Sequence, residues 1–130
     1  MNLSVKDART ISNVTLTDCK LTLEEFIAVA KFGARLEFSQ QMEDTVRASR
    51  KLLEKFLKEN RAIYGVTTGF GENVRFAISP EEATVLQQNI IRTHAVAVGE
   101  PLERTQARAV MLMTILSAGQ GHSGVRIETL

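Results

Sequence analysis

The residues best suited to chemistry lie in one short stretch, from Tyr64 to Gly71, in which the chain's only tyrosine stands among three glycines. Glycine tolerates positive φ and lets the backbone approach a ligand or another chain closely. The β-branched residues between the glycines, Val66, Thr67 and Thr68, oppose helix formation. We therefore expect an extended loop with a functional role, rather than an ordinary connection between helices.

Phosphate binding is the first chemistry to weigh for this stretch, because Gly69 and Gly71 begin like a dinucleotide-binding fingerprint. The third glycine of that pattern is replaced by Val74, and no Gly-Lys-Ser/Thr follows as in a P-loop. The segment before the loop also has a helical, basic pattern, whereas the fingerprint follows a buried strand. Nucleotide binding is therefore a disfavoured alternative.

The other side chains that could do chemistry are a cysteine and two histidines. Cys19 is the only cysteine, so it cannot form an intrachain disulfide, and no other Cys or His stands at metal-ligand spacing from it. We expect a partly buried thiol in a reducing compartment, no metal site and, because residues 1–6 lack the apolar core of a signal peptide, a cytoplasmic protein. His94 follows Leu86 and Ile90 at four-residue spacing, which places it on or beside an apolar stripe.

Composition gives no electrostatic signature of a nucleic-acid-binding or membrane-binding protein. The 130 residues carry 16 Lys and Arg against 15 Asp and Glu, a formal net charge of +1, and 44% of them are hydrophobic. Basic residues gather on one side of segment 40–59, but Glu54 and Glu59 interrupt them, so we interpret that side as a solvated face. The length predicts one domain with a modest core.

Capping signals predict the helices that must position these residues. Thr22 and Glu25 form a capping box that begins a helix of about 23–32, and Gly33 ends it. Ahead of this helix, apolar and polar residues alternate over 14–17, which would suit a short edge strand.

Two longer helices follow. A helix of about 40–59 can be capped by Ser39 and has an apolar side that would form core. Ser79, Pro80 and the two glutamates after them give a complete helix start, from which a helix is expected to run to about Val98. The predicted fold class is all-α, with a short N-terminal strand region and a Gly-rich loop.

Segment 104–118 is apolar on all sides in its C-terminal part, and the glycines around His122 then assign that histidine to a loop. The uncharged run after Arg108 is shorter than the about 20 residues that a membrane span needs, so a protein core or a subunit interface must cover this helix. At Leu130 an apolar pattern resumes without a cap, which we interpret as a truncated polypeptide.

Three blocks of the sequence resemble the N-terminal portion of the aromatic amino acid ammonia-lyases, most closely the histidine ammonia-lyases. Residues 63–71 resemble the family's tyrosine loop, residues 86–102 its substrate-contacting helix, and residues 121–126 the segment that leads toward its cofactor. The blocks occur in the family's order and cover most of the chain from about Leu21 onward.

The resemblance implies a largely helical homotetramer that eliminates ammonia from an amino acid, using an electrophilic methylidene-imidazolone (MIO) formed from an internal Ala-Ser-Gly tripeptide. That tripeptide is absent, and Ser117-Ala118-Gly119 has these residues in another order. The resemblance therefore implies that residues 1–130 are a single N-terminal region of the ammonia-lyase fold that stops before the MIO-forming segment, so that MIO is formed outside this chain.

Residue by residue, the resemblance implies an acid–base role for Tyr64 and substrate contacts for Thr93, His94 and Gly71. A phenol has a reference pKa of about 10, so it can act as a base only where neighbours stabilise its phenolate. An imidazole can hydrogen-bond an imidazole-bearing substrate, and the Thr-His pair favours histidine. Thr67 stands where many histidine ammonia-lyases have asparagine, which leaves phenylalanine- and tyrosine-acting lyases and aminomutases open.

Two classes of function remain at this point. One is an enzyme piece, inactive alone, that needs an amino acid substrate, the remainder of the lyase chain and homo-oligomerisation, with no nucleic-acid or membrane partner. The other is a noncatalytic helical module that uses the same surfaces for assembly. An Ala-Ser-Gly followed by Asp-Leu in the reading frame beyond Leu130 would decide for the enzyme.

Overall fold

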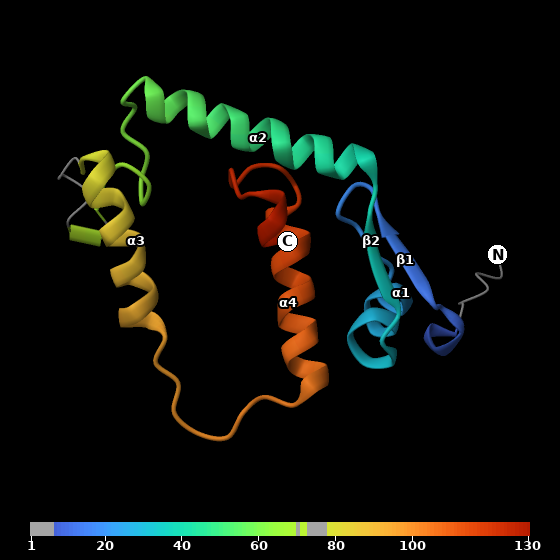
Figure 1. The fold of residues 1–130 in the computed structure, drawn as a ribbon. Coiled ribbons are helices and arrows are strands. Elements are labelled where there is room, and N and C mark those ends of the chain that lie inside the picture. Colours follow the sequence, from blue (N-terminus) through green and yellow to red (C-terminus); the bar gives the residue numbers. More distant parts are fainter. Residues whose placement is uncertain (1–6, 70, 73–77) are drawn as a thin grey trace. The chain divides into compact units, whose positions relative to one another are not determined.

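The computed structural model describes residues 7–69, 71, 72 and 78–130, and most of its regular structure is helical, as predicted (Figure 1). In chain order, the elements are η1 (Ala8–Thr10), β1 (Asn13–Leu16), α1 (Leu23–Ile27), η2 (Ala28–Phe32), β2 (Arg35–Phe38), α2 (Gln40–Lys58), α3 (Pro80–His94), α4 (Arg104–Ala118) and η4 (Ile127–Thr129).

The chain forms two compact units. The first consists of residues 1–52 together with 101–130, and the second of residues 53–100. Helix α2 begins in the first unit and ends in the second. That the whole chain is one lyase region stays a prediction.

The first unit contains a two-stranded parallel sheet of β1 and β2 (Figure 1). Val14 pairs with Leu36, and Leu16 pairs with Phe38. Val14 and Leu16 are buried while the residues between and before them are exposed, which is the alternation expected of a strand with one covered face. The predicted strand near residues 14–17 is confirmed, and its partner β2 was not predicted.

The helix between the two strands begins and ends where the capping signals placed it. Thr22 and Glu25 form the predicted capping box, with each side chain bonded to the other residue's backbone N–H. Gly33 ends the helical segment in a left-handed conformation with φ of 77°. The segment is not uniform, however, because it changes from α-helix to the wider π-helix η2 at Ala28.

The core of the first unit lies where η2, the sheet and α4 meet. Its buried cluster comprises Val14, Ala28, Val29, Ala34 and Leu112. Partly buried apolar side chains pack around this cluster: Ala8, Ile11, Leu21, Phe26, Leu36 and Leu116. The α4 residue in the cluster comes from the far end of the sequence, so α4 completes a core that the first 38 residues begin.

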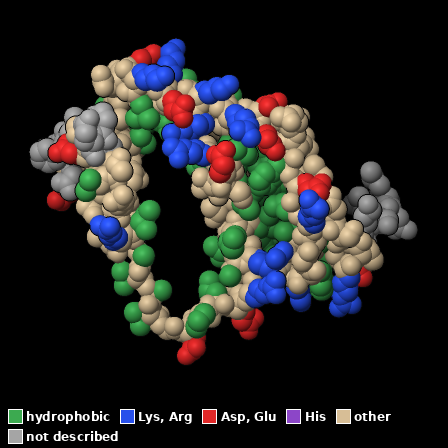
Figure 2. All heavy atoms as spheres, viewed as in Figure 1, with side chains coloured by type: hydrophobic (Ala, Val, Ile, Leu, Met, Phe, Trp, Pro, Cys, Tyr) green, Lys and Arg blue, Asp and Glu red, His purple; other side chains and the backbone are tan. Residues whose placement is uncertain are grey.

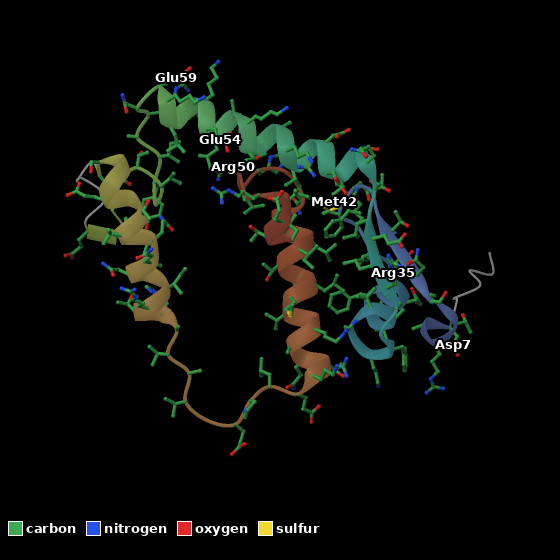
Figure 3. All side chains as sticks on the ribbon, in the orientation of Figure 1. Asp7, Arg35, Met42, Arg50, Glu54 and Glu59 are labelled. Atoms are coloured by element: carbon green, nitrogen blue, oxygen red, sulfur yellow. The ribbon has the colours of Figure 1, made fainter. Side chains whose placement is uncertain are left out.

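Helix α2 follows its predicted pattern. Ser39 caps it, because its Oγ accepts a hydrogen bond from the Met42 backbone N–H at 3.2 Å. Met42 and Val46 are buried, and acidic and basic side chains alternate over the exposed surface of the helix (Figure 2). Arg50 and Glu54 stand one helical turn apart on it (Figure 3). This mixture of charges agrees with a solvated face.

Helix α4 is covered on one side within this chain. Of its apolar residues, Leu112 is buried, but Val110, Met111 and Met113 are 58%, 64% and 56% exposed. Within one copy of this chain α4 therefore packs along one side, and the cover of its other side by a subunit interface stays a prediction. The described residues include no helix that is long and apolar enough to cross a membrane.

Candidate functional site

The stretch around Tyr64 is a hydrogen-bonded turn over residues 63–67, not the extended loop that we expected. The backbone N–H groups of Val66 and Thr67 both donate to the Ile63 carbonyl, each at 3.0 Å. Gly65 takes φ of 71°, which its lack of a Cβ permits. Within the predicted loop, Phe70 lies outside the described residues.

Two neighbouring threonines hold this turn through their hydroxyl groups. Thr67 Oγ1 accepts from the Ile63 N–H at 2.8 Å and donates to the Arg61 carbonyl at 2.7 Å. Thr68 is buried, and its Oγ1 accepts from the Gly65 N–H at 3.4 Å. The two threonines therefore stabilise the turn by side-chain bonds to the backbone, as threonine often does outside helices.

Tyr64 lies at this turn with 62% of its surface exposed. Its hydroxyl oxygen accepts a hydrogen bond from the Gly71 backbone N–H at 3.3 Å. The structure thus brings together two of the four predicted site residues. This bond restrains the direction of the Tyr64 hydroxyl group.

Thr93 and His94 form the last turn of α3, and His94 is exposed. Its Nδ1 lies 2.9 Å from the Ile90 carbonyl oxygen and 3.1 Å from Thr93 Oγ1. A carbonyl can only accept, so Nδ1 carries the proton in this contact, and in the neutral ring the Nε2 lone pair is then the acceptor. Thr93 Oγ1 in turn donates to the Asn89 carbonyl at 2.8 Å. His94 is therefore an oriented surface imidazole, not a core histidine.

Helix α3 ends at His94, four residues before the predicted end at Val98. The Val96 N–H donates to the His94 carbonyl at 2.8 Å, and Ala95 has φ of −75° and ψ of 54°. These values describe an inverse γ-turn, which cannot continue a helix. Val98 is fully exposed, so the apolar stripe that we expected does not extend through it.

One hydrogen bond joins α3 to the tyrosine turn within the second unit. The Gln87 side-chain Nε2 donates to the Gly65 carbonyl at 3.0 Å. Gln87 and His94 are seven residues apart, which is about two helical turns, so they share a face of α3. We did not single out Gln87 from the sequence, although it belongs to the block at 86–102 that resembles the family's substrate-contacting helix.

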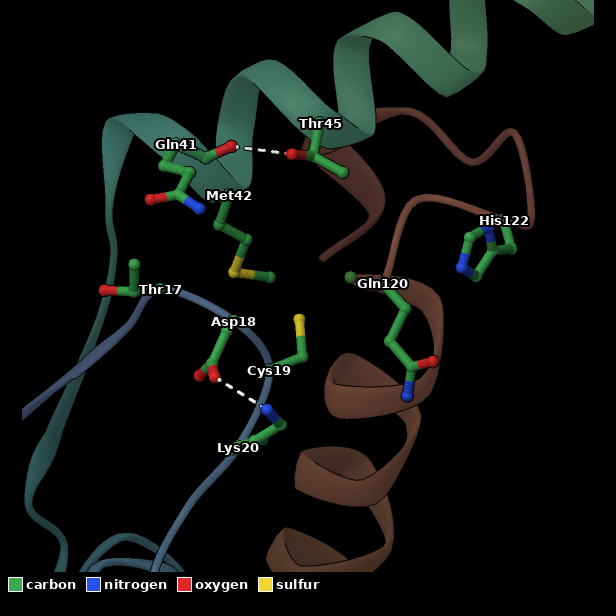
Figure 4. Close-up of a pocket in the computed structure, with 10 residues that line it drawn as sticks. Thr17, Asp18, Cys19, Lys20, Gln41, Met42, Thr45, Gln120 and His122 are labelled. Carbon is green, nitrogen blue, oxygen red and sulfur yellow. Dashed lines mark hydrogen bonds and ion pairs between the residues drawn. The ribbon is translucent and has the colours of Figure 1, made fainter.

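Cys19 lines an open pocket of about 360 Å³ in the first unit (Figure 4). Burial raises the pKa of its thiol, and the negative charge of Asp18 adds to this rise. Lys20, 3.2 Å from the Asp18 carboxylate, hydrogen-bonds it and lowers its pKa. The raised pKa leaves less reactive thiolate at a given pH than a free cysteine would have.

His122 lines the same pocket. It belongs to the first unit, whereas the tyrosine turn belongs to the second. Over the residues that the structure describes, no group of three or more His, Cys, Asp and Glu side chains is arranged to hold a metal ion.

Comparison with known proteins matches most of the chain to one family. The family model described as aromatic amino acid lyase matches residues 21–130. The chain is 49% identical over 110 residues to the histidine ammonia-lyase of Streptococcus gordonii, covering 85% of this chain and 21% of that protein. It is 43% identical over 117 residues to the histidine ammonia-lyase of Streptococcus pyogenes serotype M49, covering 90% of this chain and 23% of that protein. It thus spans about a fifth of the length of these relatives.

Solved structures also match most of this chain. The histidine ammonia-lyase of Trypanosoma cruzi matches with a TM-score of 0.76 and 34% identity, over 90% of this chain and 23% of that one. The ergothionase of Treponema denticola matches with a TM-score of 0.84 and 26% identity, over 90% and 24%. The tyrosine aminomutase of Streptomyces globisporus matches with a TM-score of 0.80 and 31% identity, over 88% and 22%.

Proposed function

Because the chain belongs to the aromatic amino acid lyase family, we propose that it is the N-terminal part of an ammonia-lyase that converts histidine to urocanate and ammonia. The curated relatives quoted above, which are histidine ammonia-lyases, support histidine as the substrate. The electrophile MIO would activate the amino acid for loss of ammonia. This chain lacks the Ala-Ser-Gly from which MIO forms, so it cannot supply that group itself.

Tyr64 is the acid–base residue in this proposal. Removing a proton from a weakly acidic carbon requires a base within hydrogen-bond reach of it. The observation that carries the assignment is the hydrogen bond from the Gly71 N–H to the phenol oxygen, which directs the hydroxyl group of an exposed tyrosine. The exposure of Tyr64 leaves its ring accessible to a substrate.

His94 contacts the side chain of the substrate. The bond between its Nδ1 and the Ile90 carbonyl leaves Nε2 as the acceptor, which matches an N–H of a substrate imidazole. Thr93 Oγ1 contacts the same Nδ1, so both contacts set the direction of the imidazole before a substrate binds. A site with an oriented acceptor penalises substrates that lack a donor there.

A phenylalanine- or tyrosine-acting lyase or aminomutase is the second candidate. Thr67 favours it, because many histidine ammonia-lyases have asparagine at this place. The similarity to tyrosine aminomutase and to the phenylalanine aminomutase of Pantoea agglomerans, which has a TM-score of 0.82 and 31% identity, points the same way. A noncatalytic helical module is the alternative outside enzymes.

Complementation tests these candidates. Alone, the chain is expected to show neither lyase activity nor MIO absorbance. Combined with the remaining segment of a histidine ammonia-lyase, or expressed as part of a full-length chain, it is expected to release urocanate and ammonia from histidine. Cinnamate formed from phenylalanine, or coumarate formed from tyrosine, would instead identify the second candidate, and a β-amino acid product would identify an aminomutase. No turnover by an assembly that contains MIO would identify the noncatalytic module.

We also propose that the assembled enzyme is a cytoplasmic homo-oligomer. The exposed apolar side chains of α4 support the homo-oligomer, because a monomeric protein rarely leaves a large contiguous apolar patch uncovered. Val110 and Met113 line an open groove on that helix.

A further inference from the structure

We propose that Gln87 is a positioning residue for Tyr64, acting through the backbone of Gly65. This inference rests on the proposed acid–base role of Tyr64. Gln87 contributes no atom to the chemistry, but it fixes the turn from which the tyrosine side chain extends. Its side-chain amide donates to the carbonyl of Gly65, the residue directly after Tyr64.

The two bonds to Gly65 explain why one glutamine can control this turn. Glycine is the most flexible residue in a chain, and at φ of 71° Gly65 occupies a region that most other residues avoid. Its N–H donates to Thr68 Oγ1, and its carbonyl accepts from Gln87 Nε2. The peptide planes on both sides of Gly65 are therefore held, one by the turn itself and one by α3. Thr68 directly follows the turn, whereas Gln87 ties Gly65 to α3. The Ile78 N–H also bonds the turn from outside, at the Thr67 carbonyl.

The position of Gln87 on α3 gives this bond its functional meaning. Gln87 and His94 share one face of the helix, separated by about 10 Å along its axis at 1.5 Å per residue. The helix that carries the substrate-contacting imidazole is thus also the helix that holds the tyrosine turn. A base must be held within a fraction of an ångström of its productive position, so such a tie affects the rate more than substrate binding.

Glutamate at position 87 is the informative substitution. Gln87→Glu keeps the size and shape of the side chain and its helix propensity, but an ionised carboxylate has no N–H to donate. The matched control is Gln88→Glu, which makes the same charge change at the next, exposed position of α3. Gln87→Lys provides an N–H donor again, on a longer side chain, and is expected to restore part of the wild-type restraint on Gly65.

Tyrosine fluorescence provides a direct measurement on this chain. Tyr64 is the only tyrosine and there is no tryptophan, so the whole signal comes from the turn. Loss of one hydrogen bond is expected to shift the turn about two- to ten-fold toward open conformations. We expect Gln87→Glu to raise the acrylamide quenching constant of Tyr64, with Gln88→Glu at the wild-type value and the far-UV circular dichroism unchanged in both.

Kinetics of the complemented enzyme give the second measurement. Gln87→Glu is expected to lower kcat with little change in KM, since substrate contacts remain, and Gln87→Lys is expected to recover part of kcat. Equal quenching constants for Gln87→Glu and Gln88→Glu overturn the inference. A changed quenching constant supports it even if the wild-type enzyme turns over no histidine, in which case it is the proposed function that fails.

Discussion

The Arg108 side chain donates two hydrogen bonds to the carbonyl oxygen of Val29, at 3.2 Å from Nε and 2.7 Å from Nη2. Val29 is buried in the π-helix η2, near the end of a helical segment, where backbone carbonyls lack partners inside the helix. Helix α4 therefore does two things for the first unit. It packs Leu112 into the core, and it satisfies a buried carbonyl.

Replacing this arginine tests the second contribution. Arg108→Leu keeps an aliphatic chain but leaves the Val29 carbonyl without its donors, so we expect a loss of about 1–3 kcal/mol in the free energy of unfolding. Urea unfolding followed by circular dichroism measures it. Arg104→Leu, at the exposed start of the same helix, is the control and is expected to change stability by less than about 0.5 kcal/mol. Equal effects of the two variants would refute the role of the Val29 bond.

The thiol of Cys19 is expected to react slowly with iodoacetamide at neutral pH. Burial and then the charge of Asp18 raise its pKa, so less of the reactive thiolate is present than for a free cysteine. Asp18→Asn removes the negative charge, lowers the pKa and is expected to speed the reaction at a fixed pH. A rate unaffected by this substitution would show that Asp18 does not act on the thiol.

The same pKa shift sets the direction of a stability effect. The pKa of Cys19 is higher in the folded chain than in the unfolded chain, so the unfolded chain loses its proton first as the pH rises. The contribution of Cys19 to stability is present below the unfolded pKa and is lost as the pH increases through the folded pKa. Cys19→Ser is expected to reduce the alkaline sensitivity of unfolding.

In the complemented enzyme, Tyr64→Phe is expected to lower kcat by about 10²–10⁴-fold, the usual contribution of a general acid–base group. Phenylalanine keeps the ring but lacks the oxygen that accepts from Gly71. Steady-state kinetics with histidine measure the effect. Turnover at the wild-type rate would exclude the acid–base assignment.

His94→Leu is expected to change selectivity. Removing the Nε2 acceptor is expected to lower kcat/KM for histidine far more than for an apolar amino acid, because only histidine loses a hydrogen bond. Comparing kcat/KM for histidine and phenylalanine in wild type and variant gives the result. A ratio that does not change would move the substrate assignment toward phenylalanine or tyrosine.

The chain alone is expected to self-associate through α4. The exposed side chains of Val110, Met111 and Met113 provide the apolar surface. Light scattering at increasing concentration measures the mass, and Met113→Lys is expected to shift it toward monomer. A clean monomer at high concentration that binds no hydrophobic dye would contradict this prediction.

The sequence predicted local features well because both partners of each interaction lie within one helical turn. The capping boxes at Thr22 and Ser79 are confirmed for this reason. The pairing of β1 with β2 and the bonds from Arg108 and Gln87 join residues far apart in sequence, so no local pattern predicts them. The early end of α3 was missed because side-chain bonds in its last turn, and the γ-turn after it, outweigh an apolar spacing that continues to Val98.

The first unit is interrupted in sequence, because residues 53–100 separate its two segments. Residues 1–52 emerge from a ribosome before residues 53–100, and α4 emerges after both. The early segment can pair β1 with β2, but Leu112 and Arg108 arrive only after the intervening residues are made. Closing so long a loop costs conformational entropy before its contacts stabilise anything. Before α4 is synthesised, the Val29 carbonyl lacks its Arg108 donors and is hydrated, and the core of the early segment lacks Leu112.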